Sequence, residues 1–229
     1  MRFAVLVFPG TWSDHDCQYV LQEHLGQEAE RVWHREGDLD GYDAVVVPGG
    51  FSYGDYLRCG AIARFSPVMD AVKRHADAGR PVFGSCNGFQ ILCEAGLLPG
   101  ALLRNDSLQF RCHDQYVRVE RDDTGFSCAA REGDALMLPI SHGEGNYYVD
   151  DETLAELEGD HRVVFRYSDA GGAVTPESNP NGSRAGIAGV MNAAGNVLGM
   201  MPHPERSSEA LLGNEDGLLV WRSMIERWS

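Results

Sequence analysis

The chain has 229 residues, of which 43% are hydrophobic and 23% charged, as in an ordinary globular protein with a sizeable core. Its formal net charge of −15 and its lack of a basic run argue against nucleic acid or an anionic membrane surface as partners. No apolar stretch approaches membrane-spanning length, and the N-terminal apolar run is too short for a signal peptide, so we expect a cytoplasmic protein.

The first hundred residues alternate apolar runs with amphipathic segments. Ser13 can cap a helix that runs to about Leu25, and Ser66-Pro67 starts a second helix that ends near Gly79. His75 lies on the apolar face of that second helix, where we interpret it as a packed core histidine. Strands of a parallel sheet are predicted at residues 3–8, 29–34, 43–47 and 81–83, and the near-continuous apolar run 3–8 is typical of a strand buried on both faces.

After residue 100 the runs become short and alternating, which is typical of antiparallel strands. Residues 121–135 are predicted to form a polar loop, and the apolar face of residues 218–228 predicts a closing helix. Further strands are predicted at 108–112, 116–119 and 163–167, with a hairpin of 187–191 and 197–201. We therefore expect one α/β domain over residues 1–229, with a mostly parallel central sheet flanked by helices and added antiparallel strands.

The segment 81–96 contains the strongest chemical signal. A short apolar strand breaks at Gly84-Ser85-Cys86-Asn87-Gly88, and a helix ending at Gly96 follows. Glycines on either side permit a strained strand-to-helix turn that projects the central side chain above the sheet edge. Cys86 would lie at a helix N-terminus, which favours a thiolate, and the N–H of Asn87 would be free to stabilise an oxyanion.

A single cysteine is more often an inert buried residue than a nucleophile, and Cys93 fits that alternative. The pattern around Cys86 favours the nucleophile. The other cysteines form no C-x-x-C pair, and the eight histidines form no H-x-x-x-H or H-E-x-x-H pattern. We therefore expect a reducing compartment and no metal.

A thiolate nucleophile needs a base, and the base needs an orienting acid. The segment Met201-Pro202-His203-Pro204-Glu205 offers both, if its prolines hold it extended beside Cys86. The alternative is a surface loop with a solvated His203 and Glu205.

Two glycine-rich segments are further candidates for the site. Residues 48–52, Pro-Gly-Gly-Phe-Ser, follow a predicted parallel strand, so a glycine N–H there could face Cys86. Residues 141–147, Ser-His-Gly-Glu-Gly-Asn-Tyr, form a polar cluster that could be catalytic, substrate-contacting or only a turn. No phosphate-binding glycine motif for ATP or a dinucleotide occurs.

Together these motifs resemble the class I (triad) glutamine amidotransferases, which have a flavodoxin-like fold. The signature is G-x-C-x-G-x-Q at 84–90 and H-x-E at 203–205, with Ser85 where a small aliphatic residue is more usual. The segments 48–58, 86–92, 141–147, 179–183 and 201–206 look like the glutaminase subunits of purine biosynthesis, in the same order along the chain.

The resemblance implies roles for single residues. Cys86 would attack the side-chain amide of L-glutamine, and His203, oriented by Glu205, would carry the proton to ammonia. The N–H groups of Gly50 and Asn87 would form the oxyanion hole. Gln90 would contact bound glutamine.

The resemblance also implies partners. Because no ATP motif is present, we expect no cofactor in this chain and place ATP and Mg²⁺ on a large synthetase subunit, joined by a small accessory subunit. Segments 51–64 and 141–147 would contribute to that interface. Three rival interpretations remain. The first is a DJ-1/PfpI-like cysteine hydrolase, but such enzymes usually carry an acid near the end of the first strand, where this chain has Phe-Pro-Gly-Thr at residues 8–11. The others are a non-catalytic protein that kept the fold and a glutaminase for a different acceptor.

Overall fold

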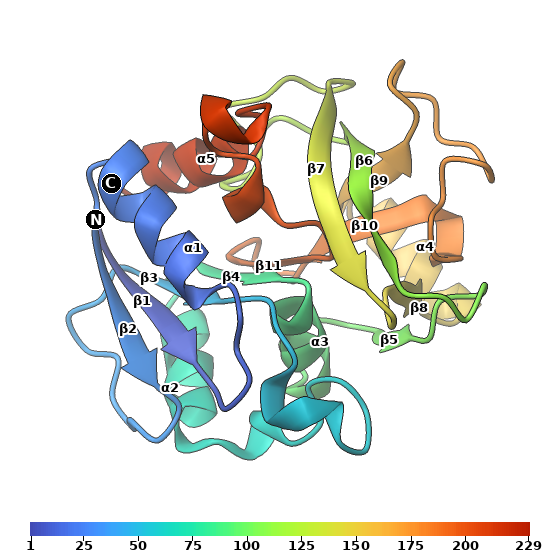
Figure 1. Ribbon diagram of the computed structural model, residues 1–229. Coiled ribbons are helices and arrows are strands. Elements are labelled where there is room, and N and C mark those ends of the chain that lie inside the picture. The colour runs from blue at the N-terminus through green and yellow to red at the C-terminus, as the bar shows by residue number, and fades with distance from the viewer.

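A nine-stranded sheet forms the centre of the computed structural model, which describes residues 1–229 (Figure 1). Its strands are β1 (Arg2–Val7), β2 (Glu28–Trp33), β3 (Ala44–Val47), β4 (Val82–Ser85), β6 (Arg111–Val119), β7 (Ala135–His142), β9 (Val163–Ser168), β10 (Ile187–Met191) and β11 (Val197–Met200). Their order across the sheet is β2-β1-β3-β4-β11-β10-β9-β6-β7. A separate two-stranded sheet pairs β5 (Ala101–Leu103) with β8 (Asn146–Tyr148).

The sheet has a parallel half and an antiparallel half. Strands β2, β1, β3, β4 and β11 pair in parallel, whereas β10, β9, β6 and β7 extend the sheet with antiparallel pairs. All residues of β3 and β4 are buried, as expected for strands covered on both faces. The predicted fold class, a parallel core with an antiparallel extension, is confirmed.

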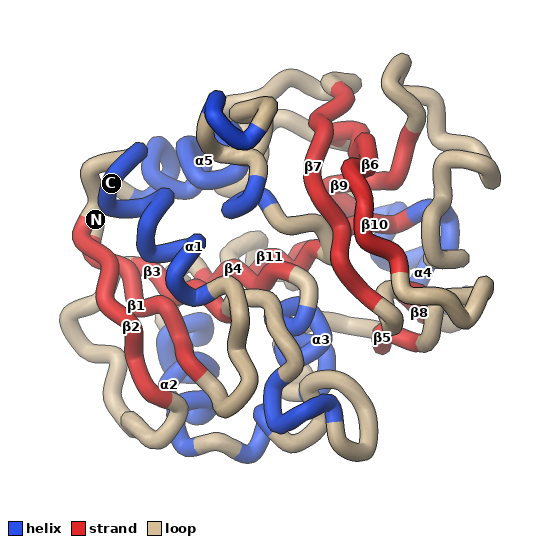
Figure 2. Tube along the Cα trace, in the orientation of Figure 1, coloured by secondary structure: helices blue, strands red, loops and turns tan.

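Helices cover both faces of the parallel half (Figures 1 and 2). They are α1 (Asp14–Tyr19), α2 (Pro67–Asp77), α3 (Asn87–Glu94) and α5 (Leu218–Trp228), whereas α4 (Asp151–Gly159) lies beside the antiparallel half. Phe83 of β4 packs edge-on against Trp221 of α5, with ring centroids 5.1 Å apart, while its neighbour Gly84 faces α3. None of these helices combines the length and the apolar character that crossing a membrane requires.

Glycines bring α3 unusually close to the sheet. A Cβ atom on Gly88 would overlap the carbonyl of Val47, and one on Gly199 would overlap the ring of Phe89. Gly88 of the elbow motif therefore serves packing as well as turning, because it lets the helix that follows Cys86 lie directly on β3, and Gly199 of β11 does the same on the other side.

Two expectations about the elements are wrong. Residues 108–112 and 116–119 do not form two strands: β6 is one strand over residues 111–119, and its polar middle lies outside the core and is largely exposed. The first helix ends at Tyr19, a π-helical turn continues to His24, and the side chain of Ser13 caps nothing. Its hydroxyl instead accepts a hydrogen bond from Arg206, at 3.0 Å.

Four elements were not predicted, namely β5, β7, β8 and α4. Strand β7 alternates buried and half-buried residues along its length, and it tolerates Pro139 because it lies at the edge of the sheet. Helix α4 begins with a regular N-cap, since Oδ1 of Asp150 accepts the N–H of Thr153 at 2.8 Å.

Candidate active site

Cys86 lies at the junction of β4 and α3, at the carboxyl end of the parallel sheet. Its backbone angles, φ 49° and ψ −108°, are rare for a residue with a side chain. Two main-chain bonds hold this conformation: the N–H of Cys86 donates to Met200 (2.8 Å), and its carbonyl accepts from Gln90 (3.2 Å). The strained turn is the nucleophile elbow predicted from the glycines, and such strain persists where the surroundings over-determine it.

His203 and Glu205 form a buried pair, with Nδ1 of His203 2.6 Å from Oε1 of Glu205. The segment is not extended as predicted, because Pro204–Arg206 makes a single 3₁₀ turn that brings the two side chains together. The N–H of His203 donates to the carbonyl of Pro139 (2.8 Å), which anchors the turn to β7.

The pair is electrostatically matched. Burial alone lowers the pKa of His203, but the charges of Glu205 and of the Cys86 sulfur raise it to about 10. Burial raises the pKa of Glu205, but the charge and hydrogen bond of His203, together with the charge of Arg206, lower it by more. The pKa of Glu205 is therefore below its ordinary value. Atom Nε2 of His203 has no hydrogen-bond partner, so it is free to exchange a proton with a substrate.

Cys86 and His203 line one cavity of about 210 Å³. The Sγ of Cys86 lies 3.5 Å from the carbonyl oxygen of Ser141, which places the start of the 141–147 segment beside this sulfur. The other lining residues are Trp12, Gly50, Phe51, Ser141 and Arg206. The structure thus assembles the cysteine, histidine and glutamate that the sequence motifs indicate.

Gly50 reaches the same cavity from the loop after β3. It has φ +147°, and a Cβ atom there would lie 2.6 Å from the main-chain nitrogen of Trp12, so only glycine fits. Gly50 pairs with Thr11 in an isolated antiparallel bridge. The hydrogen bonds of this bridge are made by the neighbouring residues, since the N–H of Trp12 and the N–H of Phe51 are the donors. The N–H of Gly50 therefore makes no hydrogen bond. Asn87 is the first residue of α3, where a main-chain N–H has no acceptor within the helix.

Gln90 is buried and does not line the cavity. Its Oε1 accepts from Nδ2 of Asn87 (2.8 Å), and its Nε2 donates to the carbonyl of Glu144 (2.7 Å). Both ends of the amide are therefore engaged within the protein, and its contact with glutamine stays a prediction.

Arg206 is a site residue to which sequence reasoning gave no role, although it lies inside a quoted motif. Its guanidinium donates to Oγ of Ser13 (3.0 Å) and to Oδ2 of Asp16 (3.3 Å). It thereby ties the turn that carries Glu205 to the start of α1. The contact joins residues far apart in the sequence, so no local pattern could reveal it.

The segments 141–147 and 179–183 meet in a buried polar network behind Ser141. Atom Nδ1 of His142 lies 3.2 Å from Oδ1 of Asn105, and its Nε2 lies 3.4 Å from Nδ2 of Asn181. Asn181 and Ser183 also donate to the carbonyl of Gly145. Burial, with the nearby charge of His203, lowers the pKa of His142 to about 4, so it is neutral and supports the site structurally.

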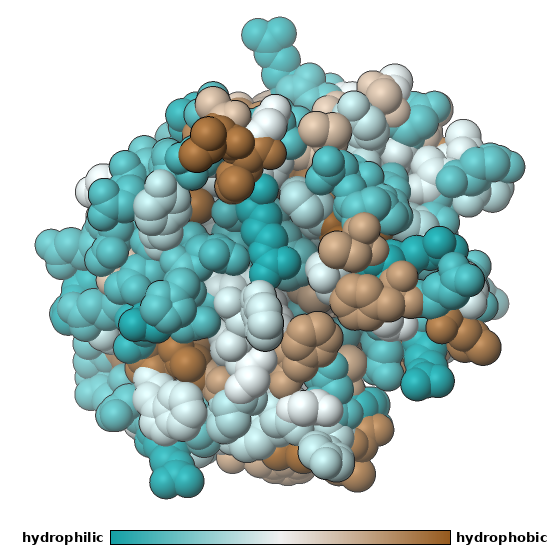
Figure 3. Space-filling view, viewed as in Figure 1, coloured by the Kyte–Doolittle hydropathy of each residue, from teal (hydrophilic) through white to brown (hydrophobic).

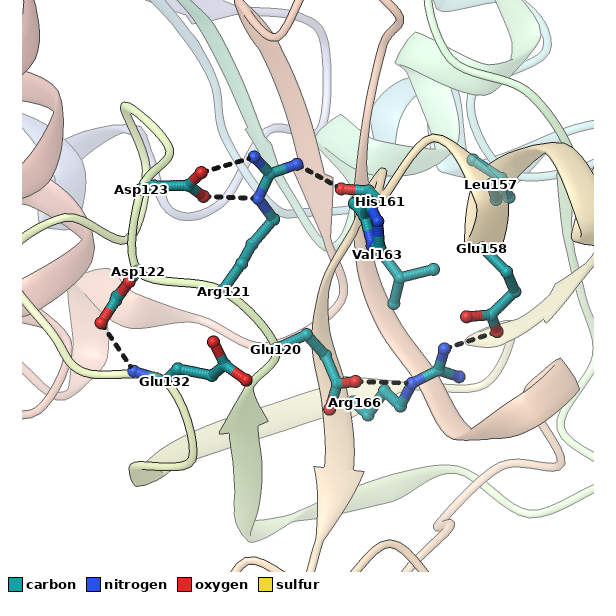
Figure 4. Close-up of a pocket in the computed structure, with 10 residues that line it drawn as sticks. All are labelled: Glu120, Arg121, Asp122, Asp123, Glu132, Leu157, Glu158, His161, Val163 and Arg166. Carbon is teal, nitrogen blue, oxygen red and sulfur yellow. Dashed lines mark hydrogen bonds and ion pairs between the residues drawn. The ribbon is translucent and has the colours of Figure 1, made fainter.

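A larger hollow of about 410 Å³ lies elsewhere, between the loop after β6 and the end of α4 (Figure 4). Its arginines are already paired: Arg166 with Glu120 and Glu158, and Arg121 with Asp123. None of the candidate catalytic residues lines it. No group of three or more metal-ligating side chains in the chain is arranged to hold a metal ion.

Comparison with known proteins agrees with this geometry. A family model described as a CobB/CobQ-like glutamine amidotransferase domain matches residues 1–217. The chain is 56% identical to the phosphoribosylformylglycinamidine synthase subunit PurQ of Salinibacter ruber, covering all of this chain and 97% of that protein. It is 54% identical to the PurQ subunit of Moorella thermoacetica, with the same coverage.

Solved structures give the same result. A chain in the structure of PurLQS from Thermotoga maritima matches with a TM-score of 0.88 and 41% identity, covering 100% of this chain and 99% of that one. A glutamine amidotransferase from the same organism, at 16% identity and TM-score 0.64, shares the fold.

The chain therefore belongs to the glutamine amidotransferases, of the class I architecture with a cysteine at the nucleophile elbow. Within them it belongs to the PurQ family, the PurQ subunits of phosphoribosylformylglycinamidine synthase, and the resemblance found in the sequence is confirmed.

Proposed function

We propose that this chain, as a single domain over residues 1–229, hydrolyses L-glutamine to glutamate and ammonia through a thioester on Cys86. The observation that carries the proposal is that Cys86 and His203 line one cavity, while Glu205 is buried against Nδ1 of His203 and leaves Nε2 without a partner. The chemistry needs only side chains and main-chain N–H groups that line or border that cavity.

In the first half-reaction the sulfur of Cys86 attacks the amide carbon of glutamine. The carbonyl oxygen becomes an oxyanion, which the N–H groups of Gly50 and Asn87 stabilise. The carbon–nitrogen bond then breaks, and His203 gives its proton to the leaving nitrogen, so ammonia departs and a thioester remains. The raised pKa of His203 lets the imidazole hold the proton that the thiol gives up when it attacks.

In the second half-reaction a water molecule attacks the thioester carbon. His203, now neutral, takes a proton from that water, and Glu205 stabilises the imidazolium that forms. The carbon–sulfur bond breaks, glutamate leaves, and the proton on His203 is available to the departing sulfur of Cys86. Proton and charge return to their starting positions.

The ammonia is passed to an ATP-dependent synthetase subunit, PurL, in a complex with the small subunit PurS. There it converts formylglycinamide ribonucleotide to formylglycinamidine ribonucleotide in purine biosynthesis. Membership of the PurQ family and the match to a chain of a PurLQS structure support this assignment. Because this chain has no phosphate-binding glycine motif, we assign ATP and Mg²⁺ to the synthetase. Six free cysteines fit a reducing compartment, the cytoplasm.

The face that carries the site has the apolar surface that a partner needs. Figure 3 shows separate apolar groups on the face seen in Figure 1. Trp12 and Phe51 line the cavity and are exposed, and the ring of Phe51 lies 6.5 Å from that of the exposed Phe110. Tyr56 and Leu57 project from the same loop as Phe51 and are also largely exposed. We propose that the synthetase covers the exposed apolar side chains around the cavity mouth, because Phe51 and Phe110 gather beside the cavity instead of being scattered singly.

A second candidate function is a glutaminase for a different acceptor, which would share every catalytic residue. The match over the whole chain to PurQ subunits favours formylglycinamide ribonucleotide. A non-catalytic role is disfavoured by the intact triad.

The test is to treat the purified chain with a glutamine-mimicking diazoketone, measure the intact mass and map the adduct. We expect one adduct on Cys86, blocked by glutamine and absent in His203→Ala. Labelling is then repeated with PurL, PurS and formylglycinamide ribonucleotide present. If Cys86 stays unlabelled there as well, the proposed function is wrong.

A further inference from the structure

The carboxylate of Glu205 has fewer hydrogen bonds than its burial would lead one to expect. The side chain is fully buried, and its Oε1 lies 2.6 Å from Nδ1 of His203. The second oxygen, Oε2, is also buried and has no hydrogen-bond partner. A buried carboxylate with so few hydrogen bonds stays ionised only if positive charge lies close to it. The neighbours of Glu205 must therefore supply that charge.

Arg206 is the permanent cation beside this carboxylate. Burial raises the pKa of Glu205, and the charges that oppose this effect are those of His203 and Arg206. The start of α1 contacts the turn that carries Glu205, but it brings the acidic residues Asp14 and Asp16. The balance of charge around Glu205 therefore depends on the two cations that flank it in the chain.

The positive charge of His203 is not constant through the proposed reaction, because its proton passes to the leaving nitrogen. While the imidazole is neutral, only Arg206 balances the charge of Glu205. A guanidinium group keeps its proton throughout. Arg206 would thus hold Glu205 ionised and ready to stabilise the imidazolium that forms again in the second half-reaction.

The start of α1 also fixes the guanidinium in position. Nη2 of Arg206 donates to Oγ of Ser13 (3.0 Å), and Nε donates to Oδ2 of Asp16 (3.3 Å). Ser13 is fully buried, and its own N–H donates to the carbonyl of Gly49 at 3.1 Å. A Cβ atom on Gly49 would lie 3.2 Å from Oγ of Ser13 and 2.5 Å from Cε1 of His203. The imidazole and the hydroxyl that anchors the guanidinium therefore pack against the same glycine.

We propose that Arg206 is a positioning residue that places a permanent positive charge beside Glu205. The start of α1 holds this charge in place through Ser13 and Asp16. Arg206 acts through Glu205 on the imidazole of His203, without contacting the reacting atoms. This inference rests on the proposed glutaminase function and adds to it a charge that stays fixed while the proton moves.

The first experiment measures kcat and KM for glutamine in the complex with PurL and PurS, for wild type, Arg206→Met and Arg206→Lys. R206M removes the charge, and we expect kcat to fall roughly 10- to 100-fold, because a poorly held general base is misplaced. R206K keeps the charge but loses the planar fork, so its kcat should lie at least about threefold above that of R206M. KM is expected to change less than about threefold in both, since no substrate contact is lost.

Chemical rescue of Arg206→Ala separates a missing charge from a damaged fold. The side chain of Arg206 is 29% exposed and lines the cavity, so a small cation can enter the space that R206A leaves. We expect millimolar guanidinium chloride to raise the kcat of R206A at least about fivefold, through charge-assisted hydrogen bonds to the free acceptors. Urea, which is neutral and has a similar planar shape, and sodium chloride at the same concentration should not raise it.

Asp16→Ala tests the anchor while the charge of Arg206 is kept. The side chain of Asp16 is 45% exposed, so this variant should fold and assemble even where R206M does not. We expect its kcat to fall by about two- to fivefold, the effect of losing one partly exposed ion pair.

The matched control is Arg118→Met. The side chain of Arg118 is 33% exposed and its Nε donates to Oε1 of Glu120 at 2.6 Å, but it does not line the cavity. We expect R118M to keep the wild-type kcat and KM and to gain nothing from guanidinium.

Four results would overturn the proposal. A raised KM with kcat retained in R206M would make Arg206 a substrate contact, and unchanged kinetics would remove its role. Equal losses in R206K and R206M, with no gain from guanidinium in R206A, would exclude the charge. Wild-type kcat in D16A would show that α1 does not hold it. Loss of the proposed function itself is separate, since the wild-type complex would then show no glutaminase activity.

Discussion

Gly49 and His203 lie so close that a Cβ atom on Gly49 would be 2.5 Å from Cε1 and 3.2 Å from Nδ1 of the imidazole. The imidazole of His203, the proposed base, therefore packs against a glycine just after β3. Gly50, the next residue, would supply the N–H of the proposed oxyanion hole, so both glycines of the motif border the candidate site.

Gly49→Ala is expected to displace the imidazole of His203 and lower kcat roughly 100-fold, because the added methyl group and the ring cannot both fit. The backbone of Gly49 does not require a positive φ, so the fold should persist. Glutaminase assays of the complex, with thermal melting of the chain, measure both effects. The control is Gly37→Ala, where a Cβ atom meets nothing within 4 Å. Equal activity of the two variants would contradict this role for Gly49.

Glu205→Gln is expected to lower kcat by about 10² to 10⁴, because the imidazolium loses its negative partner while the shape of the pair is kept. Without Glu205, burial dominates and the pKa of His203 falls below its raised value of about 10. Titration of His203 by NMR, alongside the kinetics, would detect this shift. An unchanged His203 titration would show that Glu205 does not set the charge of the site.

The same pair makes a pH-dependent contribution to stability whose sign can be worked out. The pKa of His203 is raised in the folded state, so that contribution is present below the ordinary value of 6.5 and is lost as the pH rises through about 10. The pKa of Glu205 is lowered, so its contribution is present above 4.5 and is lost at lower pH. In urea unfolding, the difference between wild type and Glu205→Gln should therefore be largest between these two ordinary values. A difference that grows toward pH 10 would contradict the assignment.

Local patterns predict the parts of the site that are close in sequence. The elbow at Cys86 depends on neighbouring glycines, and His203 lies two residues from Glu205, so spacing alone identifies them. The contacts of Gly49 with His203, and of Arg206 with Ser13, join distant segments and have no sequence signature.

The errors in the fold have the same origin. The sequence pattern divides strand β6 because a polar middle interrupts the alternation, yet backbone pairing with β7 and β9 continues. Strand β7 carries the alternation Leu136, Leu138 and Ile140, but Pro139 weakens it as a strand signal. A proline, which has no main-chain N–H, is tolerated there because β7 is an edge strand. Whether a strand lies at the edge depends on the order of the strands, which no local pattern reveals.

Ser85→Ala is expected to leave stability unchanged or raise it by up to about 1 kcal/mol, because the hydroxyl of Ser85 is buried without a hydrogen-bond partner. Ser223 is the matched control: its Oγ donates to Leu219 (2.7 Å) and accepts from Ala129 (2.9 Å). Ser223→Ala should lose about 1–3 kcal/mol in urea unfolding. A similar loss in both variants would indicate a partner for Ser85 that the geometry does not provide.

Acidification is expected to destabilise the protein through His142. Its Nε2 faces the donor Nδ2 of Asn181, so a proton there would oppose another donor. Its pKa in the folded state is about 4 against an ordinary 6.5, so the unfolded state binds more protons between these values. Stability therefore falls as the pH drops from about 6.5 to about 4, by at most about 1.4 kcal/mol per pH unit.

Urea unfolding over this pH range would test the contribution of His142, with His142→Gln as the variant that keeps an acceptor near the position of Nε2. The free energy of unfolding of the variant should fall less steeply with decreasing pH than that of the wild type. It should still fall, because the pKa of the buried His75 is also lowered to about 4. A variant as steep as wild type would show that His142 titrates normally.

Leu57→Glu is expected to weaken assembly with the synthetase at least about tenfold while leaving the fold intact. Leu57 is 91% exposed, so its side chain contributes nothing to the core and is available to a partner. Leu211 is the matched control, because it is 86% exposed but lies outside segments 51–64 and 141–147. Titration of PurL and PurS with each variant, followed by coupled activity, measures the effect. If Leu57→Glu binds normally, and substitutions at Arg58 and Glu144 leave assembly and coupling unchanged, these segments do not form the interface.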